Sequence, residues 1–168
     1  MQKNSGLSAE SRSHTRSISW LVEPVITQQT KFNATRLGIA DAEFDFPDTC
    51  LDDCEIKTSP RSYFVNVKIH KMTGRENKND IAAVEKLYMQ YSANAEYHLI
   101  YACFGIHFQN IHIRFDPDYL CLFSPQFLPI YANPRNDKIQ AFYRHQPQER
   151  TRAQFLEELC RNSRSIKL

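Results

Sequence analysis

Glycine is scarce in this chain, with only 4 residues in 168. Loops that cradle phosphates in P-loop and dinucleotide-binding proteins depend on closely spaced glycines. Neither a Walker pattern nor the pattern G-x-G-x-x-G occurs in the sequence. The scarcity of glycine therefore excludes a nucleotide-binding protein of either kind.

The sequence also lacks an apolar run long enough to span a bilayer, and it shows no signal-peptide pattern. Its 5 cysteines are odd in number and irregularly spaced, which suits a reducing compartment better than a disulfide framework. Cys50 and Cys54 have the spacing of two zinc ligands, but the sequence has no second Cys or His pair at ligand spacing to complete the site. We therefore expect a cytoplasmic protein with no membrane segment and no structural zinc.

Charge is nearly balanced, and a net charge of +2 is too small to indicate a nucleic-acid partner by itself. Acidic residues gather between positions 41 and 55, whereas the tail after Cys160 is basic. The length predicts a single domain with a substantial core. Residues 1–19 are rich in serine and poor in apolar side chains, so we expect them to be disordered and residues 20–168 to form the domain.

Residues 63–70, Tyr-Phe-Val-Asn-Val-Lys-Ile-His, have the alternation of a β-strand. Phe64, Asn66, Lys68 and His70 share one face, and the opposite face is wholly apolar. We expect the apolar face to point to the core. An amide and an amine two residues apart can hold a metal ion together with a phosphate or water, although the pattern alone is also that of a strand with a solvated outer face.

Turn signals and hydrophobic spacing place further elements around this strand, and their order predicts an α/β fold with a mixed sheet. The expected elements are a helix from Pro24 toward Phe32, strands over 38–46 and 55–57, a helix capped by Asn79 or Asp80, strands over 97–106, 110–115 and 119–123, a turn at 116–118, a loop or helical turn over 125–130, an edge strand over 138–145, and a helix opened by a capping box at Thr151.

Asp41 at the start of one strand and Asn66-Val67-Lys68 near the end of the next long strand resemble the PD-(D/E)XK nuclease pattern. The segment after Lys68 is similar to the stretch that follows the catalytic lysine in several type II restriction endonucleases. The resemblance covers about residues 38–91. It implies a restriction-endonuclease-like mixed β-sheet flanked by helices, which binds Mg²⁺ and cuts double-stranded DNA.

The sequence departs from that pattern at two positions. Asn66 stands where the motif has Asp or Glu, and Ala40 stands where it has proline; a literal Pro47-Asp48 lies further on. An amide oxygen binds Mg²⁺ more weakly than a carboxylate does, so such a site would need a substrate phosphate to complete it.

The resemblance implies roles for individual residues. Asp41 and Asn66 would hold Mg²⁺, and Lys68 would orient the attacking water or stabilise the developing charge, which makes these three the expected catalytic residues. A twofold-symmetric DNA site would call for a homodimer. The residues expected to contact DNA are Arg75, Asn77 and Lys78, with Lys138, Arg144, Arg161 and Arg164 along the backbone.

The choice of acid depends on strand pairing. If residues 41–46 and 62–69 pair antiparallel, Asp41 lies near Asn66, and Asp48 lies at the far end. A rival triad is Glu55-Ile56-Lys57 with Asp41 or Asp48. Asp48, Asp52 and Asp53 are expected to lie in a solvated loop, and His70 on the surface.

Two other classes of function fit the same sequence. An inactive DNA-binding or interaction protein would keep the fold but carry Asn66 as the mark of a decayed site. A small α/β structural protein would bind no DNA at all.

Overall fold

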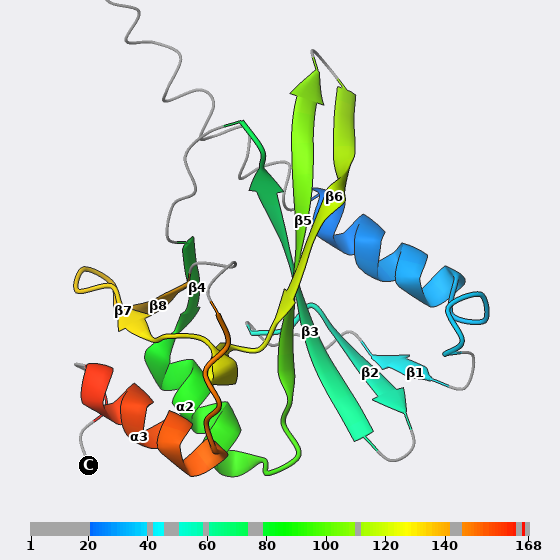
Figure 1. The fold of residues 1–168 in the computed structure, drawn as a ribbon. Coiled ribbons are helices and arrows are strands. Elements are labelled where there is room, and N and C mark those ends of the chain that lie inside the picture. Colours follow the sequence, from blue (N-terminus) through cyan, green and yellow to red (C-terminus); the bar gives the residue numbers. More distant parts are fainter. Residues whose placement is uncertain are drawn as a thin grey trace, which may run out of the picture.

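The computed structural model describes residues 21–39, 42–45, 51–58, 61–73, 79–109, 112–141, 146–163 and 166. Its larger sheet has five strands in the order β1-β2-β3-β5-β6 (Figure 1). β3 and β5 are parallel, and every other neighbouring pair is antiparallel. The predicted α/β class with a mixed sheet is therefore confirmed. The strands are β1 (Glu43–Asp45), β2 (Cys54–Thr58), β3 (Arg61–Lys71), β5 (Leu99–Gln109) and β6 (His112–Phe123).

Helices cover this sheet from two sides. The first helix (residues 21–32) lies on the other side of β5 and β6 from α2 (Val84–Ala93) and α3 (Arg152–Asn162) in Figure 1. The main core lies under α2 and α3, where β5 contributes Leu99, Tyr101 and Cys103, all fully buried. No helix among the described residues is long and apolar enough to cross a membrane.

A smaller sheet combines β4 (Asn79–Ala83), β8 (Lys138–Ala141) and β7 (Tyr131–Ala132), in the order β4-β8-β7. The expected cap at Asn79 or Asp80 is therefore wrong, and α2 begins only at Val84. The Asp80 carboxylate instead accepts hydrogen bonds from the amides of Asn133, Asn136 and Gln140. β8 is the middle strand of this sheet, so the expectation of an edge strand is also wrong.

Both faces of β3 are covered, and the polar face packs against the larger core. The Phe64 ring lies 4.4 Å from that of Tyr97, and the His70 ring stacks on Tyr119 at 5.3 Å. Val67, on the opposite face, is only 2% exposed. The sequence predicted that the apolar face points to the core; Val67 is buried there, but the main core lies on the polar face, because helices cover both sides of the sheet.

The expected turn at 116–118 lies within β6 and does not end it. Phe104 pairs with Leu120 and Ile106 with Phe115, so Gly105 alone lies opposite four residues of β6. The Asp118 N–H donates to the Asp116 carboxylate, which gives a local turn inside a bulge. A side chain at position 105 would place its Cβ 2.6 Å from the Cβ of Tyr119, so this close approach requires glycine.

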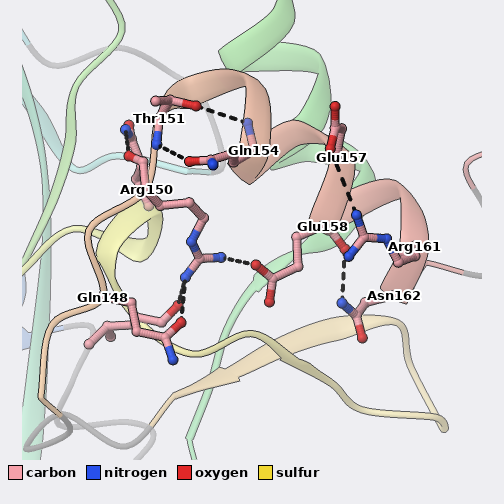
Figure 2. Close-up of polar contacts among 10 residues, drawn as sticks. Gln148, Arg150, Thr151, Gln154, Glu157, Glu158, Arg161 and Asn162 are labelled. Atoms are coloured by element: carbon pink, nitrogen blue, oxygen red, sulfur yellow. Dashed lines mark hydrogen bonds and ion pairs between the residues drawn. The ribbon is translucent and has the colours of Figure 1, made fainter.

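The predicted capping box at the start of α3 is confirmed, with reciprocal hydrogen bonds between Thr151 and Gln154 (Figure 2). The preceding Arg150 side chain is only 6% exposed. Its guanidinium contacts Glu158 at 2.5 Å, donates to the Leu128 carbonyl and lies over the Phe155 ring. Arg150 therefore joins α3 to the segment that follows β6.

Candidate functional site

The candidate site lies where β2 separates from β3. Cys54 is the first residue of β2 and pairs with Val65. The preceding Asp53 still donates its backbone N–H to the Val65 carbonyl at 2.8 Å. Its carboxylate accepts the backbone N–H of Val67 at 2.6 Å. Past the start of β2, the Asp53 carboxylate thus accepts the hydrogen bond that a backbone carbonyl of β2 would otherwise accept from Val67, the residue after Asn66.

Asn66 is 5% exposed, and its amide N–H donates to the Leu51 carbonyl at 2.7 Å. Its amide oxygen is buried and accepts no hydrogen bond from any residue that the structure describes. A buried acceptor without a donor is costly, and such groups are ordinarily satisfied by an ordered water or an ion. The Asn66 oxygen is therefore a candidate ligand atom for a cation.

The Lys68 ammonium donates to the Val67 carbonyl at 3.1 Å. In an extended strand, the N–H and C=O of one residue point to the same neighbouring strand. The Val67 N–H meets Asp53, so the Lys68 ammonium and the Asp53 carboxylate gather at the same edge of β3. The Lys68 ammonium therefore binds the Val67 carbonyl oxygen, which is also of a type that a metal ion can bind.

Glu23 of the first helix adds a second carboxyl group. Burial raises the pKa of Glu23 to about 7, while the charge of Lys68 lowers it and that of Asp53 raises it. These electrostatic effects place Glu23 close enough to both side chains to respond to their charges. The first helix therefore contributes a carboxyl group within electrostatic range of Asp53 and Lys68.

Asp52 and Asp53 point in different directions, and neither lies in the solvated loop that the sequence predicted. Asp52 is 5% exposed, and its carboxylate accepts the Tyr97 hydroxyl at 3.2 Å. Burial and the Asp52 charge raise the pKa of Tyr97. Asp52 thus supports the core, and Asp53 faces β3 at the candidate site.

The pairing that favoured Asp41 is wrong, because β1 pairs with β2 and not with β3. Glu43, the first residue of β1, lies opposite Lys57, at the end of β2 that is remote from Asp53. Asp41 itself lies outside the described residues. The structure therefore brings Asp53 and Lys68 together at the backbone of Val67, the residue after Asn66, and tests no contact with Asp41.

The rival triad gains no support from the described residues. Glu55 and Lys57 form an ion pair with each other at 3.8 Å, and their proposed partner Asp48 is not described. Five of the residues expected to contact DNA, Arg75, Asn77, Lys78, Arg144 and Arg164, also lie outside the described residues.

A sequence signal for Asp53 did exist. A short strand over 55–57, a turn at Ser59-Pro60 and the long strand after it form a hairpin. In a hairpin with that turn, residue 53 lies opposite residue 66. The position of Asp53 therefore follows from pairing the second and third strands directly.

The residues at this edge suit a hard cation. The Asp53 carboxylate, the Val67 carbonyl and the Asn66 amide offer three oxygens of different kinds, which are the ligand types that Mg²⁺ accepts when waters and phosphate complete its shell. No cluster of three or more His, Cys, Asp or Glu side chains with metal-binding geometry occurs in the described part of the chain. This composition fits Mg²⁺ better than zinc.

No protein-family model matches the sequence, and no curated protein is significantly similar to it.

Proposed function

We propose that this protein is a Mg²⁺-dependent endonuclease that hydrolyses phosphodiester bonds in double-stranded DNA. The observation that carries the proposal is the meeting of Asp53 and Lys68 at the backbone of Val67, beside the buried amide oxygen of Asn66. A mixed sheet flanked by helices is also the arrangement that the resemblance to PD-(D/E)XK nucleases implies. In this proposal Asp53 takes the role that the sequence alone assigned to Asp41.

The residues divide the chemistry of hydrolysis among them. Asp53, Asn66 and the Val67 carbonyl would hold Mg²⁺, which when bound would act as a Lewis acid on a phosphate and on the attacking water. The Lys68 ammonium, which donates to the Val67 carbonyl in the structure, would turn to a phosphate oxygen and stabilise negative charge as water attacks phosphorus. The P–O ester bond would then break, and the departing oxygen would take a proton from solvent water. Glu23, with its raised pKa, can accept the proton that the attacking water loses.

Nicking of supercoiled plasmid DNA tests this function directly. We expect nicking and linear product with Mg²⁺ or Mn²⁺ and none with EDTA. A second candidate, an inactive DNA-binding protein, is favoured by the neutral amide at position 66, which gives the site one carboxylate fewer than the motif. It predicts salt-dependent binding in a gel shift and no nicking with any divalent metal.

Asn66→Asp is expected to make the fold depend on metal. The Asn66 N–H that faces the Leu51 carbonyl becomes a second acceptor, which costs about 1–3 kcal/mol in a buried position. Mg²⁺ should recover much of this loss, because it binds a carboxylate more strongly than an amide. Melting temperatures in EDTA and in excess MgCl₂ measure both effects, and nicking by the variant should exceed that of the wild type.

Asn94→Asp is the matched control, because Asn94 is exposed at the end of α2 and its side-chain oxygen accepts from the Glu96 N–H, as an aspartate oxygen also can. Its melting temperature should respond to Mg²⁺ as that of the wild type does. If Mg²⁺ stabilises Asn66→Asp no more than this control, position 66 does not bind the metal.

Glu23→Gln is expected to change how stability depends on pH in metal-free protein. The pKa of Glu23 is raised from 4.5 to about 7 in the folded state, so the folded state binds more protons and loses stability as pH rises through that window. Glutamine removes the charge, so the variant should gain about 1–2 kcal/mol over the wild type at pH 8, after allowance for partial solvation, and little at pH 4. Urea unfolding at both pH values measures the difference.

Glu96→Gln removes an exposed carboxylate and serves as the control for this comparison. It should leave stability within about 0.5 kcal/mol of the wild type at both pH values. An equal gain in unfolding free energy for Glu23→Gln at pH 4 and pH 8 would contradict the conclusion that folding buries the Glu23 carboxyl group.

A further inference from the structure

Beyond the end of β3, strands β5 and β6 continue as a two-stranded ribbon. β3 ends at Lys71, opposite Ile106, and the pairs His107–Arg114, Phe108–Ile113 and Gln109–His112 lie further out. Figure 1 shows these two strands projecting past the rest of the sheet. We call residues 106–109 and 112–115 the β5–β6 ribbon.

The back of the ribbon is apolar. Ile106, Phe108, Ile113 and Phe115 share this face by alternation and register. The ring of Phe115 packs against Phe104 with centroids 6.1 Å apart, and the Lys71 ammonium lies 5.4 Å from the centre of the Phe108 ring. These contacts anchor the ribbon to the sheet on one face.

The front of the ribbon is polar and carries His107, His112 and Arg114. His112 and Arg114 are exposed, and the His107 side chain is 40% exposed. His107 Nε2 lies 2.7 Å from the Asp116 carboxylate, which orients its ring. The Arg114 guanidinium has no hydrogen-bond or ion-pair partner within the described part of the chain, and its donors are available to a ligand.

This front belongs to the same sheet face as Lys68. Lys68 lies opposite Cys103 and His70 opposite Gly105, and the next alternate residue of β5 is His107. At about 3.3 Å per residue, the end of β5 lies roughly 20 Å along the strand from the level of Lys68. That distance corresponds to about six base pairs of duplex DNA at 3.4 Å each. The separation along the strand therefore lies within the length of duplex that one protein can contact.

We propose that the polar front of the β5–β6 ribbon reads base edges in the major groove of duplex DNA. The inference rests on the proposed DNA substrate and names the element that selects the sequence. The major groove admits a two-stranded β-ribbon, and an arginine in it donates to both acceptors of a guanine. An imidazole N–H of His112 adds a donor beside Arg114. The Asp118 carboxylate is exposed in the bulge beside the ribbon, and it would accept from a cytosine amino group.

A binding selection in EDTA tests the ribbon without requiring cleavage. The probe is a pool of double-stranded DNA with a randomised central segment, sequenced after capture on the protein. The wild type should enrich a defined motif, and its affinity for that motif is then measured by fluorescence anisotropy. Arg114→Ala should weaken binding to the motif about 5- to 100-fold and relax one position of it.

Two variants control for charge and for ribbon integrity. Arg61→Ala removes an exposed arginine at the opposite end of β3, and Ile113→Thr changes the back of the ribbon. Both should enrich the wild-type motif with nearly unchanged affinity. A duplex RNA of the same sequence should bind weakly, because the major groove of A-form RNA is too narrow to read.

The outcomes separate this proposal from the proposed nuclease activity. An unchanged motif and affinity for Arg114→Ala would overturn the ribbon and leave the nuclease intact. Selective binding that depends on Arg114, without nicking, would support the ribbon and contradict the nuclease. Failure of the wild type to bind any DNA, or equal binding to duplex RNA, would overturn the reading of a major groove.

Discussion

Asp53→Ala is expected to reduce Mg²⁺-dependent DNA cleavage by about 10²- to 10³-fold or more, the scale of losing one group that stabilises charge at a reacting phosphate. The loss should appear in the rate of cleavage at saturating DNA, and DNA affinity in EDTA should change little. Single-turnover nicking and anisotropy measure the two separately. Lys68→Ala should give a loss of similar size, because the two side chains meet at Val67.

Asp52→Asn is the matched control for Asp53. It removes the neighbouring carboxylate but keeps an oxygen that can accept the Tyr97 hydroxyl, so cleavage should fall by less than about tenfold. Asp41→Ala tests the acid that the sequence alone favoured. Cleavage that survives Asp53→Ala and disappears with Asp41→Ala would refute the site described above.

Arg150→Ala is expected to cost about 2–3 kcal/mol of unfolding free energy. Removing one partner of a buried ion pair commonly costs about 3–5 kcal/mol. The Glu158 side chain is 29% exposed, so water can partly solvate its charge and the cost is smaller. The substitution also leaves the Leu128 carbonyl without its donor and removes the cation over Phe155. Urea unfolding measures the loss, and Arg150→Lys should recover only part of it, because lysine lacks the planar fork.

Arg161→Ala provides the comparison on the same helix. Arg161 pairs with Glu157 at 3.7 Å, one turn apart, but its side chain is 74% exposed (Figure 2). Such exposed pairs contribute about 0.5 kcal/mol or less. Equal costs for Arg150→Ala and Arg161→Ala would show that burial does not set the strength of these two contacts.

Elements with strong local signals were predictable from the sequence. The alternation of apolar and polar residues predicted the strand β3 (61–71), and the capping box of Thr151 and Gln154 predicted the start of α3. Residues 99–106 are apolar almost throughout because β5 is central and covered on both faces. In these segments, local preference and tertiary environment favour the same conformation.

Other features depend on partners far along the chain. Asn79 and Asp80 are good helix caps in isolation, but pairing of β4 with β8 makes them a strand, and amides from β8 and the segment before it satisfy Asp80. The candidate acid depends on strand order: with β2 between β1 and β3, Asp53 meets Asn66. The raised pKa of Glu23 arises from tertiary burial, which helical spacing alone does not reveal.

The parallel pairing of β3 with β5 imposes an order on folding. Asp53, Asn66 and Lys68 all belong to the hairpin of β2 and β3, whose short connection makes closure inexpensive in chain entropy. Phe64 can pair with Leu99 only after the intervening chain, which includes β4 and α2, has formed the crossover connection between the two parallel strands. We expect the backbone of the candidate site to form early, and the ribbon and the C-terminal helix to dock onto it afterwards, so that slow or incomplete folding would expose the unpaired edge of β3 first.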